Sequence, residues 1–271
     1  GNRGYYFGNN FTFKGAGYIS TYGNADATWE IANKMNVGVD LELFHSLTLA
    51  VDYFTEHRYN IFMQRNSLAA TAGMGATVPY ANLGEVDNRG VDISASYNKV
   101  VNEDLTVGVR GTFTYAHNEV KAMDEPQYPD KNKHLSKIGH PMQAHKVLVA
   151  EGLFTSQDEI ANSPEQLLGT VVRPGDIKYR DINGDGRIDN DDKAIISPYG
   201  TSPRIQYGIG ANLRWKNWDL GVFFNGSAKR TIIAGNITAF GTNDYNVMQF
   251  VADRAWRLDN PDPNAEYPRL G

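Results

Sequence analysis

Acidic and amide side chains alternate between residues 181 and 192, in a pattern that suits a bound cation. Ca²⁺ prefers six to eight oxygen ligands, and alternate residues of a tight loop converge on one centre. Gly186 falls where such a loop must turn sharply. The predicted ligands are the side-chain oxygens of Asp181, Asn183, Asp185, Asp189 and Asp192 and the backbone carbonyl of Arg187.

The last of these positions carries Asp192 where calcium loops more often carry glutamate. The shorter side chain predicts weak closure, and no pair of amphipathic helices flanks the loop as in a calcium sensor. We therefore expect Ca²⁺ to stiffen a long loop structurally rather than to take part in chemistry. The alternative is a solvated turn that binds no metal.

The rest of the chain lacks the motifs of common enzymes. Its six histidines form no HExxH motif, it has no cysteine, and no GxSxG or phosphate-binding glycine loop is present. No carboxylate pair stands out, although a glycan-cleaving enzyme stays an open alternative. The net charge of −5 argues against a nucleic-acid partner. We predict no catalytic residues and no enzymatic activity.

Three hairpins are predicted from apolar residues that alternate with polar ones, which indicates paired strands with one apolar face. Their apolar runs cover residues 35–53, 91–115 and 207–224, with short turns at Phe44-His45-Ser46, Asn102-Glu103-Asp104 and Lys216-Asn217. Polar side chains on the opposite face include Asp40, Asp92, Arg110 and Arg214.

Long connections join these hairpins, from about Thr55 to Asp87 and from about Asn118 to Pro203. Short turns on one side and long loops on the other are typical of outer-membrane barrels. A transmembrane helix is excluded, because mean hydropathy is −0.46 and no long apolar run exists.

Aromatic residues near both ends of the apolar runs suggest the two girdles of a membrane barrel. Phe44, Tyr97, Trp215 and Trp218 are expected near the short turns, and Tyr53, Tyr115, Tyr207 and Phe224 towards the long loops. A soluble β-sandwich also has alternating strands and remains the alternative on pattern alone. The loop residues Tyr128 and Tyr199 either stack on sugars or pack within their loops.

Several stretches resemble, in order, the SusC/RagA family of TonB-linked outer-membrane transporters. They are residues 28–38 (TWEIANKMNVG), 84–92 (GEVDNRGVD), 150–160 (AEGLFTSQDEI), 174–189 (PGDIKYRDINGDGRID) and 218–227 (WDLGVFFNGS). The resemblance implies a barrel of roughly 22 antiparallel strands around a plug. It also implies import of glycans or peptides, a SusD-like lipoprotein at the extracellular mouth, and TonB as the energy source.

The expected fold is therefore all-β: a segment of an antiparallel transmembrane barrel with long extracellular loops, about 118–203 being the longest. Residues 1–271 are expected to be one partial barrel domain of about eight strands, with plug and final strands absent. The expected location is the outer membrane, in contact with its lipid. The alternative function is a secreted soluble β-domain that binds glycan and carries a structural calcium loop.

Overall fold

Six antiparallel strands form one continuous sheet in the computed structural model, which describes residues 4–7, 12–15, 22–68, 71, 78–234 and 246–270. Their alternating, β-branched and aromatic-rich sequences suit a pleated sheet with two different faces. The order across the sheet is β14-β13-β6-β5-β4-β3. The bounds are β3 (Ile31–Leu43), β4 (Leu47–Gln64), β5 (Tyr80–Asn102), β6 (Leu105–Ala122), β13 (Ile205–Trp215) and β14 (Trp218–Ala228).

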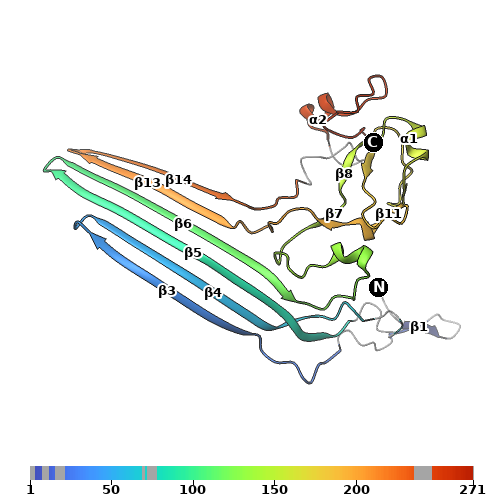
Figure 1. The fold of residues 1–271 in the computed structure, drawn as a ribbon, viewed down its shortest axis with the longest axis horizontal. Helices are drawn as coiled ribbons and strands as arrows, with labels where there is room; N and C mark the ends of the chain where they lie inside the picture. Colours follow the sequence, from blue (N-terminus) through green and yellow to red (C-terminus); the bar gives the residue numbers. More distant parts are fainter. Residues whose placement is uncertain are drawn as a thin grey trace.

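All three predicted hairpins are confirmed, and their short turns lie together at one end of the sheet (Figure 1). Leu43 pairs with Leu47 across the first turn, and Trp215 pairs with Trp218 across the third. Lys216 and Phe44 adopt positive φ angles of 52° and 56°, which tight hairpin turns require. The long connections emerge at the opposite end.

The boundaries predicted for the long connections were wrong. Strand β4 continues to Gln64 and β5 begins at Tyr80, so most of the expected loop from Thr55 to Asp87 is strand. Likewise, β6 runs past Asn118 to Ala122. In these extensions polar side chains such as Glu56 and His57 are mixed with apolar ones such as Ile61 and Phe62, without regular alternation. The period-two signal therefore disappears although the ladder of hydrogen bonds continues.

In the described part six strands form the main sheet, and the expected number of about eight barrel strands stays a prediction. Residues 123–204 instead form short elements at the loop end: η2 (Asp130–Leu135), β7 (Lys146–Val147), β8 (Ala150–Leu153), α1 (Gln157–Ala161), β9 (Glu165–Gln166), β10 (Ile177–Tyr179), β11 (Arg187–Ile188), η3 (Asn190–Asp192) and β12 (Ala194–Ile195). The remaining elements are the hairpin β1 (Gly4–Phe7) with β2 (Thr12–Gly15), and α2 (Gln249–Arg254).

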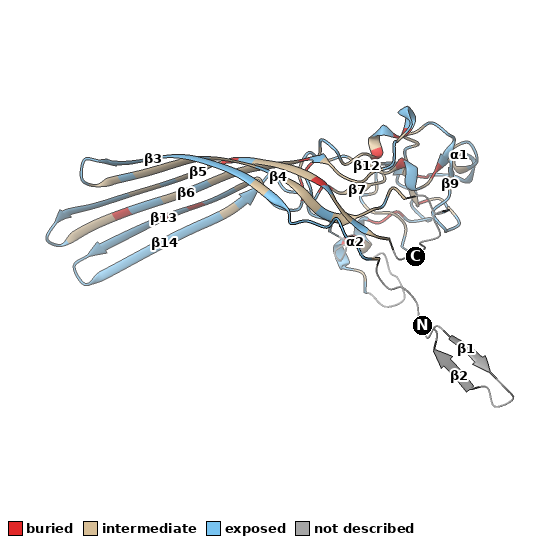
Figure 2. Cartoon of the chain, turned by 90° about the horizontal axis from the view of Figure 1, so that it is seen from below, coloured by how far each residue is buried: buried red, intermediate tan, exposed pale blue. Residues whose placement is uncertain are grey.

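The main sheet is a single layer with one apolar and one polar face. Register places Val37, Tyr53, Val91 and Tyr115 on the same face, together with Ile209 and Leu220 further along. This apolar face is open: Val37, Ile209 and Leu220 are 60%, 57% and 61% exposed (Figure 2). The predicted polar positions Asp40, Asp92, Arg110 and Arg214 share the other face, as expected.

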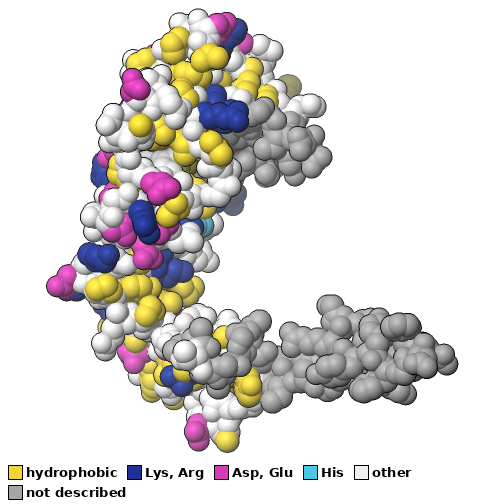
Figure 3. All heavy atoms as spheres, turned by 90° about the vertical axis from the view of Figure 1, so that its right-hand side faces the viewer, with side chains coloured by type: hydrophobic (Ala, Val, Ile, Leu, Met, Phe, Trp, Pro, Cys, Tyr) yellow, Lys and Arg dark blue, Asp and Glu magenta, His cyan; other side chains and the backbone are white. Residues whose placement is uncertain are grey.

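Aromatic side chains mark both ends of the apolar face, although not all at the expected level. Trp215 and Trp218 lie beside the short turn, and Tyr53 and Tyr115 flank Val91 at the loop end. Phe224 lies further inside, opposite Ile209. The described residues form an arc that is open on one side when seen from the loop end (Figure 3).

The buried core lies in the loop region rather than in the sheet. Phe154, Ile188, Val251 and Asp192 are its fully buried side chains, and Trp256 is 4% exposed. In this region the pKa of Glu159 is lowered, first by the Thr155 backbone N–H that it accepts and then by Lys178. Within the described residues no helix is long and apolar enough to cross a membrane.

Candidate functional site

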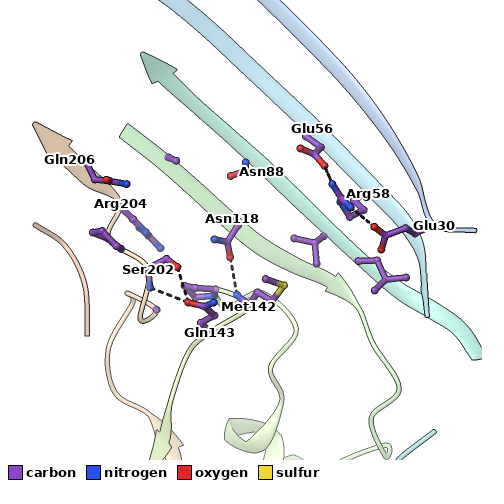
Figure 4. A pocket seen from close by; sticks show the side chains of 16 residues that line it. Glu30, Glu56, Arg58, Asn88, Asn118, Met142, Gln143, Ser202, Arg204 and Gln206 are labelled. Atoms are coloured by element: carbon purple, nitrogen blue, oxygen red, sulfur yellow. Dashed lines mark hydrogen bonds and ion pairs between the residues drawn. The ribbon is translucent and has the colours of Figure 1, made fainter. Parts of the chain in front are cut away.

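A pocket of about 570 Å³ opens on the polar face of the sheet, at its loop end (Figure 4). The strands contribute one wall and the two ends of the longest loop contribute the other. The lining residues are Glu30, Glu56, Arg58, Ile61, Val86, Asn88, Ala116, Asn118, Pro141, Met142, Gln143, Gly200, Ser202, Pro203, Arg204 and Gln206.

The strand wall is built from neighbouring rows of the ladder. Glu56, Asn88 and Asn118 lie directly opposite one another on β4, β5 and β6. Because residues paired across antiparallel strands share a face, this register alone brings the three polar side chains together. Gln206 extends the wall onto β13, where it pairs with Thr114.

The loop wall is held against the strands by side-chain hydrogen bonds. The backbone N–H of Met142 donates to Oδ1 of Asn118 over 2.8 Å. Ser202 donates to Oε1 of Gln143 from its backbone N–H, over 3.1 Å, and from its hydroxyl, over 2.8 Å. These bonds join the outgoing and returning ends of the loop at the pocket.

Charged groups occupy both sides of the pocket. Arg58 donates from Nε (2.9 Å) and Nη2 (2.6 Å) to Glu56 and also pairs with Glu30. Arg204 donates to the carbonyl of Pro198 over 2.6 Å, and its guanidinium lies 5.1 Å from the ring centroid of Tyr199. By contrast, the side chains of Asn88 and Gln206 make no hydrogen bond within the described part of the chain, so their amides are free for a ligand.

The acidic loop lies away from this pocket, between β10 and η3. Asp181 accepts backbone N–H groups from Gly184 (2.7 Å) and Gly186 (2.8 Å), which have φ angles of +72° and +82°. Asn183 and Asp185 accept from the N–H groups two residues further on, and so does Asp189. The loop thus folds around its own oxygen acceptors.

Asp192, which was predicted to close the calcium loop as its last ligand, accepts backbone hydrogen bonds in the structure. It is fully buried, with Oδ1 accepting the N–H of Ile182 (2.8 Å) and Oδ2 that of Asp189 (2.9 Å). Together with Asp189 it forms a capping box at η3. Within the described residues, no group of three or more acidic, histidine or cysteine side chains is arranged to hold a metal. The oxygen donors suit Ca²⁺ chemically, and calcium binding by this loop stays a prediction.

The pocket was not predicted from the sequence. Glu56 and Asn118 fall inside stretches predicted as loop, and Asn88 lies between a predicted loop and the apolar run that begins at Val91, so their shared register was not visible. The predicted loop rings of Tyr128 and Tyr199 each meet a cation, Lys146 at 5.8 Å and Arg204 at 5.1 Å. If the strands had been extended past the apolar band, the signal would have been one polar residue at the matching position of each of three neighbouring strands.

The family model and the curated relatives that match this chain all describe TonB-dependent receptors. The family model described as TonB dependent receptor-like, β-barrel matches residues 1–265. TonB-dependent receptor P3 of Formosa agariphila is 26% identical over 266 residues, which cover 93% of this chain and 25% of that protein. TonB-dependent receptor SusC of Bacteroides thetaiotaomicron is 24% identical over 204 residues, or 72% of this chain and 19% of that protein.

Solved structures share the fold. The structure of the RagAB peptide transporter aligns with a TM-score of 0.67 and 20% identity over 98% of this chain and 28% of that one. The RagAB peptide importer in its open-open state aligns with a TM-score of 0.65 and 22% identity over 100% of this chain and 28% of that one. The chain thus spans about a quarter of the length of the curated relatives that it matches.

Proposed function

The chain belongs to the TonB dependent receptor-like β-barrel family, and we propose that it forms part of the wall of a nutrient importer. Membership of this outer-membrane family confirms the predicted location and the prediction that the chain is not an enzyme. The observation that carries the proposal is the two-faced sheet, which has an open apolar face and a pocketed polar face. In a barrel these faces meet lipid and a water-filled lumen, respectively.

The secreted soluble domain is the weaker candidate. A soluble protein rarely exposes an apolar face that extends over several strands, because the exposed surface drives association. Val39, Leu41, Val222 and Phe224 are among many apolar side chains left open on the sheet, with exposed fractions from 43% to 69%. Such a face suits contact with the acyl chains of a lipid bilayer.

The pocket supports a peptide as the imported substrate. Amide and hydroxyl groups line it beside the apolar groups of Ile61, Val86 and Met142, and none of its described lining residues is aromatic. Sugars commonly stack on aromatic rings, whereas free carboxamides match the N–H and C=O groups of a peptide backbone. The RagAB structures are described as those of a peptide transporter, which agrees with this choice over an oligosaccharide.

Two partners belong to the same proposal. A SusD-like lipoprotein would close the loop end, where the pocket and the long loop lie together. TonB would supply energy through a plug within the complete barrel. Both follow from the resemblance to SusC and RagA and from the family membership.

Removing the free amides is expected to weaken import. We expect the double variant Asn88→Ala, Gln206→Ala to raise the half-saturating peptide concentration about thirtyfold, because each of the two lost hydrogen bonds contributes about 1 kcal/mol. The measurement is uptake of labelled oligopeptides by cells that express the intact protein. Asn217→Ala, in the short turn at the opposite end of the sheet, is the matched control. Unchanged peptide uptake in the double variant, or uptake of oligosaccharides alone, would reject the peptide assignment.

A further inference from the structure

A charged hollow lies on the apolar face of the sheet, just beyond its last apolar row. Counting towards the loop end, the row Tyr53-Val91-Tyr115 is followed by Thr55-Arg89-His117 and then by His57-Asp87-Glu119. The hollow has a volume of about 320 Å³ and is lined by side chains of the last two rows, with Lys121 beyond them. The polar pocket described above opens on the other face.

The level of this hollow matches the boundary between acyl chains and headgroups. Tyrosine rings prefer that boundary, since their bodies are apolar and their hydroxyls polar. Tyr53 and Tyr115 therefore place the next row, with Arg89, at the height of the headgroups. Arg89 is exposed and faces outwards, as the register with Thr55 and His117 requires.

The acidic groups of the hollow are already paired, whereas its main cation is not. Asp87 accepts from His57 Nδ1 over 2.7 Å and lies 3.7 Å from Lys121, which also donates to Glu119 over 2.7 Å. Arg89 makes no hydrogen bond or ion pair to any part of the chain that the structure describes. Its guanidinium is therefore free to take a planar, doubly hydrogen-bonded anion.

A second cation lies beside the same tyrosine row. The ammonium of Lys229 is 5.7 Å from the ring centroid of Tyr115, so it reaches onto the outward face from the end of β14. Phosphorylated headgroups concentrate negative charge at this level of a membrane and attract basic side chains there. Arg89 and Lys229 flank Tyr115 from two sides, which suits one phosphate-bearing lipid seated against its ring.

We propose that Arg89 and Lys229 bind the phosphate groups of an anionic lipid headgroup in the leaflet on the loop side. This site rests on the placement of the sheet in the membrane and not on what the protein transports. The acyl chains of such a lipid would lie along the apolar rows below Tyr53 and Tyr115. The lipid would thereby fix the depth of the barrel at its loop end.

The test is binding of bis-phosphorylated lipid A to the intact protein in detergent, measured by native mass spectrometry. We expect the double variant Arg89→Gln, Lys229→Gln to bind about tenfold more weakly, because charge-assisted hydrogen bonds to phosphate are lost. Lys99→Gln is the matched control, since Lys99 is an exposed cation on the same face near the short turns. Unheated gel migration verifies that each variant is folded.

Three further arms decide the outcome. Arg89→Lys should retain part of the affinity, fully dephosphorylated lipid A should bind weakly to every variant, and millimolar inorganic phosphate should not compete. Equal binding by the wild type and the double variant would overturn the proposal, as would equal loss in Lys99→Gln. Tight binding of the phosphate-free lipid would indicate that the acyl chains alone make the contacts. Full competition by inorganic phosphate would indicate a site for a free anion. Either result would overturn the proposal. Peptide import is measured separately, so failure here leaves the proposed function standing.

Discussion

Replacing Gly90 with alanine is expected to lower the free energy of unfolding by about 2–3 kcal/mol, because the strand pair has no room for a side chain. A Cβ atom at Gly90 would lie 2.3 Å from the backbone oxygen of Tyr115 and 2.4 Å from Cζ of Phe54. The phenyl ring covers the glycine on the polar face and could rotate away. The backbone oxygen belongs to the ladder between β5 and β6 and can move only if that pairing is distorted.

The measurement is urea unfolding of the intact protein in detergent. Gly111→Ala is the matched control, since a Cβ there meets nothing closer than the oxygen of Gly208 at 3.9 Å. Gly90→Val should be more damaging than Gly90→Ala. If Gly90→Ala stayed within about 0.5 kcal/mol of the wild type, the close approach of Phe54 and Tyr115 would be wrong.

Asp192→Ala is expected to open the acidic loop, since three backbone N–H groups lose their acceptor. These belong to Ile182, Asn183 and Asp189, at 2.8, 3.4 and 2.9 Å from the carboxylate. Hydrogen bonds to a charged group are worth about 1.5–3 kcal/mol, and a buried site offers no water in exchange. We expect amide exchange at Ile182 and Asp189 to become about a hundredfold faster through local opening.

Adding Ca²⁺ distinguishes the predicted calcium binding of this loop from the capping of backbone N–H groups that the structure shows. The control variant Asp185→Ala removes an exposed side chain that accepts one N–H, from Arg187 at 3.0 Å, so without Ca²⁺ it should change exchange little. Millimolar Ca²⁺ should protect the wild type but not Asp185→Ala if the loop holds the ion. No protection of the wild type would reject the metal while leaving the capping role of Asp192 in place.

The sequence predicted the part of the fold that lies in the apolar band. There, every second residue is apolar because one face meets lipid, and the hairpins 35–53, 91–115 and 207–224 stood out for that reason. The extensions from Glu56 to Gln64 and from Tyr80 to Val86 carry polar residues on both faces, and no periodicity marked them as strand. Part of the strand wall of the pocket lies in those extensions, at Glu56, Arg58, Ile61 and Val86, so these residues were missed together with them.

The acidic loop illustrates a different limit. Its spacing predicted a sharp turn at Gly186, where φ is +82°, but did not single out Gly184, where φ is +72°. It could not reveal that Asp192 is fully buried, because burial depends on tertiary packing of the loop region and not on local spacing. The predicted ligand side chains therefore accept backbone N–H groups of their own loop in the structure, whether or not an ion binds as well.

We propose that one face of this sheet meets lipid and that the other lines a lumen. The 271 residues contain no cysteine. Single cysteines at Val39 and Asp40, Ile93 and Ser94, and Ala211 and Asn212 can therefore carry a fluorophore in the intact protein once every cysteine outside these residues is replaced. In vesicles with brominated acyl chains, we expect strong quenching of the fluorophore at positions 39, 93 and 211 and weak quenching at positions 40, 94 and 212. Equal quenching within each pair, or the reverse pattern, would contradict it.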